Sequence, residues 1–237
     1  MTQTPAKDRT VDDAPVPTGV RTRDGLLIAL TLVTGAADAT TFLKLGNVFT
    51  SVMTGNMVLM GLSIGRGDVS AFGHAALAVA CYIAGTVVGS RIVGKPRADD
   101  RIWPGALTGA LIVEFTLFLV VACGWWAVGS DPTGTVQTLL LVGSTLAMGI
   151  QSSAILRLNV SGLSTTYLTG TLTTVVHAFV MQRRLRGNGR SVGVLCALVL
   201  GAALGGLLAT QLPVASPLVP LAVLATVVIT ARVVLDG

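Results

Sequence analysis

Charged side chains are scarce in this chain: Asp, Glu, Lys and Arg make up only 11% of its 237 residues. An average soluble domain is about a quarter charged, so this composition excludes an ordinary water-solvated fold. Aromatic residues are also few, at 5%, whereas hydrophobic residues of all kinds reach 52%. The composition therefore indicates a protein whose main solvent is lipid.

Cysteine and histidine are equally sparse, with three and two copies. The cysteines, Cys81, Cys123 and Cys196, show no paired spacing and have no neighbouring metal ligand, which excludes a disulfide framework and a zinc site. A Walker loop, a dinucleotide fingerprint and a nucleophile elbow are also missing. We therefore expect no cofactor, no metal and no enzymatic activity. A membrane enzyme ranks third among the functions considered, because acidic residues and a histidine lie within apolar segments without a nucleophile.

The net charge of +5 does not indicate a nucleic-acid partner, because the basic residues lie in short segments beside apolar runs. In that position they orient a chain in a membrane. Residues 1–24 are polar, contain three prolines, and lack the apolar core and cleavage site of a signal peptide. They are predicted to form a disordered cytoplasmic tail.

Six apolar runs are each near the roughly 20 residues that a helix needs to cross the bilayer. They cover residues 26–45, 71–93, 104–128, 136–158, 192–212 and 217–235. Two further segments, 48–64 and 163–181, are shorter and richer in Thr, Ser and Gly. Each of the two crosses fully, crosses as a broken helix, or enters and returns. The predicted fold class is an all-α polytopic membrane bundle with six or eight spans.

Loop charges favour the six-span arrangement. If both short segments cross, the basic connection 91–101 lies outside the cell, against the tendency of basic loops to stay in the cytoplasm. If both enter and return, all strongly basic segments lie inside. That arrangement gives N- and C-termini in the cytoplasm and a bacterial inner-membrane location.

The chain also resembles itself. Aligning Leu43-Lys44-Leu45 with Leu156-Arg157-Leu158 places Asp38 opposite Gln151. If the second copy has an insertion of two residues after this point, Thr54-Gly55 aligns with Thr169-Gly170. We therefore predict two inverted repeats, residues 25–128 and 135–237, each with three spans and one short broken or re-entrant segment.

Asp38 is the strongest candidate for a functional residue, since an ionisable side chain within a span is costly unless it has a partner or faces water. The alternative is a structural Asp that locks neighbouring helices together. The Thr-Gly segments are the second candidate, because irregular backbone at membrane depth lines a wet cavity or is buried in protein. The substrate- or ion-binding residues predicted on this basis are Asp38, Thr54, Gly55, Asn56, Gln151, Thr166, Thr169 and Gly170.

Two further residues are candidates for proton coupling. Glu114 lies among apolar residues near the middle of its span, where desolvation favours the neutral carboxyl group. His177 follows Thr166, Gly170 and Thr173 on one helical face, where it extends the polar path or is a hydrogen-bonded structural residue. With Asp38 as the carboxylate opposite the Gln151 amide, the first half would carry the ion dependence and the second would orient the solute.

The segments GAADATTFLKLGNVFTSVMTGN, MGIQSSAILRL and STTYLTGTLT together resemble the YoaK-like bacterial membrane proteins, domain-of-unknown-function family 1275. The resemblance covers residues 24–234 and implies an integral inner-membrane protein without an assigned activity. The function predicted from the residues themselves is transport of an unknown small solute through a site between the Thr-Gly segments. The alternative is a membrane-embedded binding or assembly protein, and a homo-oligomer remains open.

Overall fold

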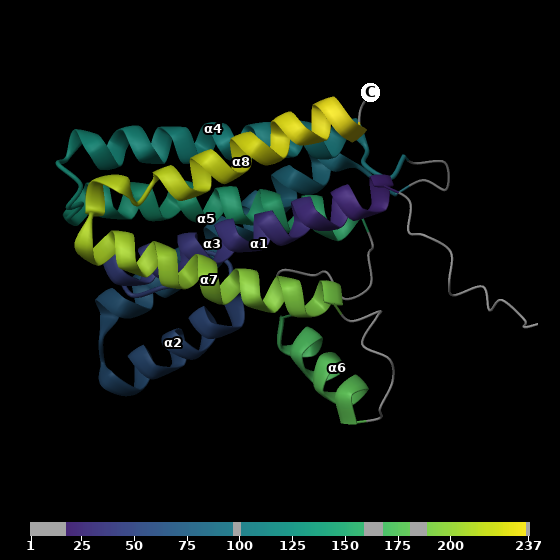
Figure 1. Cartoon of the computed structure of the whole chain (residues 1–237). Coiled ribbons are helices and arrows are strands. Elements are labelled where there is room, and N and C mark those ends of the chain that lie inside the picture. The colour runs from purple at the N-terminus through teal and green to yellow at the C-terminus, as the bar shows by residue number, and fades with distance from the viewer. Residues whose placement is uncertain (1–17, 97–100, 159–167, 181–188, 236–237) are drawn as a thin grey trace, which may run out of the picture.

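The structure, a computed structural model, describes residues 18–96, 101–158, 168–180 and 189–235, and within these ranges it is helical without a strand. The eight α-helices are shown in Figure 1. They are α1 Thr18–Lys44, α2 Met53–Arg66, α3 Val69–Val93, α4 Gly105–Ala127, α5 Gly134–Arg157, α6 Leu168–Val180, α7 Gly189–Gln211 and α8 Leu218–Thr230. A 3-10 turn, Pro213–Ala215, precedes α8, and a π turn, Ala231–Leu235, follows it.

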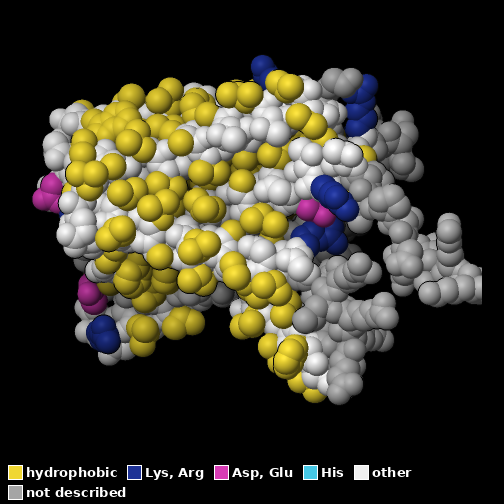
Figure 2. Space-filling model, viewed as in Figure 1, with side chains coloured by type: hydrophobic (Ala, Val, Ile, Leu, Met, Phe, Trp, Pro, Cys, Tyr) yellow, Lys and Arg dark blue, Asp and Glu magenta, His cyan; other side chains and the backbone are white. Residues whose placement is uncertain are grey.

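Six of these helices are long and apolar enough to span a bilayer, the last of them being α8 with its flanking turns. Hydrophobic side chains cover the flank of this bundle, whereas the charged side chains gather mostly at its two ends (Figure 2). This distribution matches a bilayer-spanning body with polar ends. The prediction of an all-α polytopic membrane bundle is confirmed, and the helix bounds follow the apolar runs closely.

One boundary was predicted wrongly. Helix α1 begins at Thr18, so residues 18–24 are helical and do not belong to the expected tail. The Asp24 carboxylate explains the difference, because it accepts hydrogen bonds from Arg23 and from Arg190 at the start of α7, with its oxygens 3.0 Å from each guanidinium. The Asp24 carboxylate thus links α1 to the start of α7.

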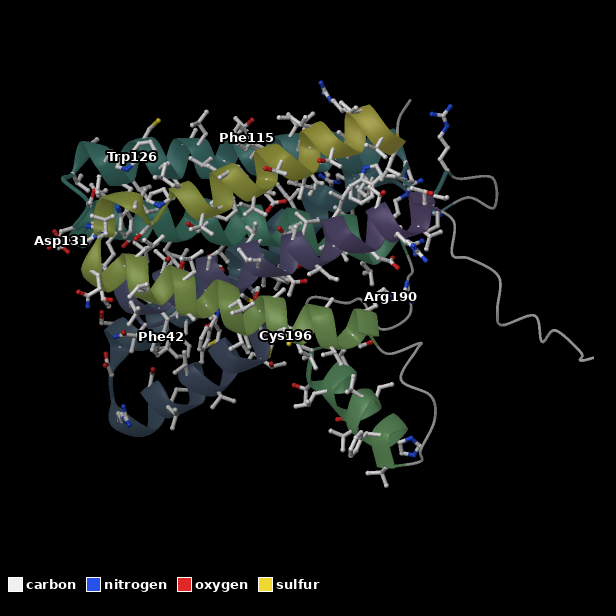
Figure 3. The ribbon with its side chains drawn as sticks, viewed as in Figure 1. Phe42, Phe115, Trp126, Asp131, Arg190 and Cys196 are labelled. Atoms are coloured by element: carbon white, nitrogen blue, oxygen red, sulfur yellow. The ribbon has the colours of Figure 1, made fainter. Side chains whose placement is uncertain are left out.

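Contacts between helix ends show which of them lie together at each end of the bundle. Lys44, the last residue of α1, lies 3.5 Å from the Asp131 carboxylate, and its carbonyl accepts a hydrogen bond from Gln137 near the start of α5. At the other end, Arg157 of α5 donates to the carbonyl of Lys95, which follows α3. Figure 3 shows Asp131 and Arg190 at opposite ends of the bundle.

Helices α2 and α6 do not cross the bundle. Helix α1 ends, and α5 begins, at the Asp131 end of the bundle. Helix α3 runs parallel to α5, because Gly85 and Gly89 of α3 lie against Leu146 and Ile150 of α5 in the same order. Helix α3 therefore also begins at the Asp131 end, and the segment that contains α2 must enter the bundle and return to that end. Helix α6 likewise connects the end of α5 to the start of α7 at the Arg190 end. With 14 and 13 residues, the two helices are about 20 Å long, which is too short for a hydrocarbon core of about 30 Å.

Two parallel helix pairs form the centre of the bundle. In the pair of α1 and α7, Gly201 lies against the backbone of Leu32, and Gly205 against that of Ala36. In the pair of α3 and α5, Gly85 lies against Leu146, and Gly89 against Ile150. Glycine spaced by four residues lets helix backbones approach closely. The two pairs therefore use equivalent residues in the two halves of the chain.

Cysteine labelling tests the returning geometry of α2. In a background lacking Cys81, Cys123 and Cys196, cysteines replacing Val69 and Asp131 should react with an impermeant thiol reagent from the same membrane face. A cysteine replacing Lys95 should react from the opposite face. Reaction of the Val69 substitution from the face that labels the Lys95 substitution would show that α2 crosses fully.

Candidate functional site

A cavity of about 430 Å³ lies between the starts of α2 and α6. Figure 1 shows both helices starting near the middle of the bundle and diverging outward, and Figure 2 shows the surface hollowed between them. Helices α3 and α5 contribute the rest of the lining. The lining residues are Val52, Met53, Thr54, Tyr82, Thr86, Ser152, Ser153, Leu156, Thr169 and Gly170.

The two Thr-Gly pairs occupy the same place in their helices, since each forms the second and third residues of α2 or α6. Thr54, Thr169 and Gly170 line the cavity. Gly55 does not: a Cβ atom there would lie 3.2 Å from the ring of Phe49, so this glycine allows close packing of the preceding loop. The structure thus brings three of the four Thr-Gly residues to one cavity.

Asp38 is not part of the cavity lining. Its side chain is buried, and one oxygen accepts hydrogen bonds from the Thr50 amide at 2.7 Å, the Thr50 hydroxyl at 2.8 Å and the Ser51 amide at 2.8 Å. The Ser51 hydroxyl donates to the other oxygen. Asp38 therefore holds the loop before α2, with protein donors on both carboxylate oxygens.

Asn56 also serves the loop before α2. Its buried side chain accepts from the Phe49 amide at 2.9 Å and donates to the Phe49 carbonyl at 2.7 Å. The Phe49 ring in turn stacks on Phe42 of α1, with ring centroids 5.0 Å apart. The sequence pattern placed Asn56 among the solute-binding residues, whereas the structure assigns its polar atoms to backbone groups of the same chain.

The expected pairing of Asp38 with Gln151 is wrong. Gln151 is fully buried and donates to the Thr34 hydroxyl at 2.9 Å and, at 3.4 Å, to the Leu30 carbonyl. The glycine contacts make Ala36 equivalent to Ile150, so Asp38 corresponds to Ser152, one residue beyond Gln151. The alignment missed this register because it was anchored at the helix ends, where the halves differ in length.

The two residues proposed for proton coupling lie outside the cavity lining. Glu114 is fully buried in α4, and no described residue donates a hydrogen bond to either of its carboxyl oxygens. His177 is exposed in the last turn of α6. Thr166, another predicted site residue, lies outside the described residues.

Replacing Glu114 with methionine should stabilise the protein by about 1–3 kcal/mol, because a buried polar group without a partner costs roughly that much. Glu114→Gln keeps a polar side chain of the same shape and should give no comparable gain. Thermal unfolding in detergent at matched protein concentration measures the difference. A clear loss of stability in Glu114→Met would show that this carboxyl group has a favourable interaction in the folded protein.

The sequence interpretation missed most of the cavity wall. Tyr82 and Thr86 on α3, and Ser152 and Ser153 on α5, were not singled out. The sequence did contain a signal for these residues: Thr86 directly follows Gly85 of the glycine pair, and Ser152 and Ser153 directly follow Gln151. Within the part of the chain that the structure describes, the lining contains hydroxyl groups but no carboxylate and no amine, so this part of the wall offers hydrogen bonds and no full charge. Among the described residues no three His, Cys, Asp or Glu side chains form a metal-binding group.

The arrangement defines a polytopic helical membrane protein with a cavity, partly lined by hydroxyl groups, between two short returning helices. Residues 26–231 match the family described as "Protein of unknown function (DUF1275)", and the chain belongs to this family. It is 36% identical over 154 residues to the UPF0700 transmembrane protein YoaK of Bacillus subtilis (strain 168), a match covering 65% of this chain and 66% of that protein. The comparison with solved structures gives no significant match.

Proposed function

We propose that this protein transports a small polar solute, and that the cavity between the starts of α2 and α6 is its solute site. The observation that carries the proposal is the place where both short helices begin, about halfway along the bundle and beside a cavity partly lined by hydroxyl groups. Irregular backbone at this depth is stable when it lines a wet cavity. Secondary transporters use such discontinuous helices to bind their solutes.

The internal symmetry supports the proposal. The contacts of Gly201 with Leu32 and of Gly85 with Leu146 are equivalent, and α1 runs opposite to α5, its counterpart in the second half. We infer that the halves are inverted repeats, α1 to α4 and α5 to α8, with the cavity between their returning helices. In alternating-access transporters, one repeat rocks against the other around such a site.

The lining favours a solute that accepts hydrogen bonds. Val52, the residue before α2, makes no side-chain cap hydrogen bond, and the first amide groups of a helix lack intrahelical partners. The N-terminal end of a helix also carries partial positive charge. The Thr86 hydroxyl already donates to the Tyr82 carbonyl at 2.9 Å, so the donors on the wall are the hydroxyls of Thr54 and Thr169. Together with the helix amides, these hydroxyls suit carbonyl, carboxylate or hydroxyl oxygens better than a bare cation.

We place the protein in the bacterial inner membrane with both termini in the cytoplasm. Basic residues gather at the end of the bundle that holds Arg190: Arg21 and Arg23 near the start of α1, Arg91 and Lys95 at the end of α3, and Arg101 before α4. Basic segments favour the cytoplasmic side. An impermeant thiol reagent added to intact cells should therefore label a cysteine replacing Asp131 but not one replacing Lys95.

A ligand screen tests the transport proposal. Purified protein is screened for small polar solutes that raise its unfolding temperature, and each hit is then assayed for uptake into liposomes containing the protein. Thr169→Val should weaken the stabilisation because it removes a hydroxyl from the cavity wall. Thr173→Val, on the same helix but outside the lining, is the matched control. A solute that stabilises the protein yet never crosses would contradict transport and favour a binding protein.

A further inference from the structure

The loop between α1 and α2 is held at three points. Asp38 takes hydrogen bonds from the Thr50 and Ser51 amides and hydroxyls, Asn56 pairs with both backbone groups of Phe49, and Phe42 stacks on the Phe49 ring. Asp38 provides the only charge among these contacts. Hydrogen bonds to an ionised acceptor are roughly twice as strong as those between neutral groups.

This charged contact lies immediately beside the cavity. Ser51, bound through its amide and its hydroxyl, is followed in the chain by Val52, Met53 and Thr54, all of which line the cavity. The position of Thr54 and the direction of the first α2 amides therefore depend on where Thr50 and Ser51 are held. Asp38 determines that position from the neighbouring helix α1.

The second half of the chain lacks this carboxylate. Ser152, the equivalent of Asp38 by helix register, lines the cavity. In the first half, the carboxylate lies outside the cavity and holds the returning segment. In the second half, a hydroxyl at the equivalent position is part of the cavity wall. Asp38 is therefore a poor candidate for a solute ligand and a good one for a residue that acts through the loop.

We propose that Asp38 is the positioning residue of the cavity: its carboxylate fixes the start of α2, so that solute binding depends on a charge that the solute does not touch. The inference rests on the proposed function and deepens it by separating the residue that positions the site from those that contact the solute. The two proposals are distinguishable, because the position of the loop is measured without a solute.

Thiol accessibility of the loop provides this measurement. Val48, 2% exposed in the loop, is replaced by cysteine in the full-length protein lacking its three native cysteines, and a small methanethiosulfonate reagent is the probe. Modification of a buried thiol requires local opening. Loss of a hydrogen bond to a charged group corresponds to about a tenfold or larger change in an equilibrium constant. Adding Asp38→Asn should therefore raise the Val48→Cys modification rate about tenfold or more.

A matched control separates positioning from general destabilisation. Val194 on α7 is fully buried and distant from the loop in the chain, so Val194→Cys reports opening of the bundle. Asp38→Asn should leave that rate unchanged. An equal rise at both cysteines, or no rise at Val48→Cys in a folded Asp38→Asn protein, would overturn the proposal.

A second set of variants keeps Asp38 and changes its donors. Thr50→Val removes one hydroxyl donor and should raise the modification rate of Val48→Cys, whereas Thr50→Ser keeps the hydroxyl and should not. This pair decides the question if Asp38→Asn does not fold. Equal rates in Thr50→Val and Thr50→Ser would also contradict the inference.

Discussion

Gly85→Leu is expected to abolish the folded bundle. A Cβ atom at Gly85 would clash with the carbonyl oxygen of Leu146 and lie 3.0 Å from its Cα atom. Overpacking a protein interior usually costs about 1–3 kcal/mol when side chains can adjust. Here the opposing atoms are backbone atoms of a parallel helix, so the two helices must separate, and we expect a cost above about 3 kcal/mol.

Gly73→Leu is the matched control for this prediction. Gly73 lies on the same helix, α3, and a Cβ atom there meets nothing within 4 Å. Size-exclusion profiles and thermal unfolding in detergent should show a folded Gly73→Leu protein and little folded Gly85→Leu protein. By the equivalence of the two helix pairs, Gly201→Leu should behave like Gly85→Leu. A stable, monodisperse Gly85→Leu protein would show that α3 and α5 do not pack as closely as described.

Asn56→Leu is expected to destabilise the protein by about 2–4 kcal/mol. The substitution leaves the Phe49 amide and carbonyl without the hydrogen bonds at 2.9 and 2.7 Å that Asn56 now provides. An unsatisfied buried polar group costs roughly 1–3 kcal/mol. The loss should therefore be large even though leucine is apolar and similar in size.

Ser63→Ala is the control for the effect of Asn56→Leu. Ser63 is buried in the same helix, but its hydroxyl donates only to the Leu59 carbonyl one turn earlier, so its removal should change stability little. Thermal unfolding in detergent measures both variants. If Asn56→Leu unfolds like the native protein and only loses solute binding, Asn56 contacts the solute, as its sequence motif suggested.

The sequence alone determined the membrane-spanning elements. Six apolar runs separated by polar connections predict six helices because a helix satisfies its own backbone in lipid, and this requirement acts locally. The basic segment 91–101 and the weak apolarity of the segments 48–64 and 163–181 also favoured returning segments over two further spans. The place of the candidate site between two Thr-Gly pairs followed from the same local pattern.

The tertiary structure decided which side chains meet. Asp38 and Thr50 are separated by only 12 residues, yet their contact depends on a loop whose course local patterns do not specify. Gln151 and Thr34 are 117 residues apart, and they meet because the glycine contacts set the helix register. A shift of one residue turns a helix by about 100°, enough to move Ser152 into the cavity wall in place of Gln151. Span length is a property of each segment, whereas the composition of the cavity depends on how the segments pack.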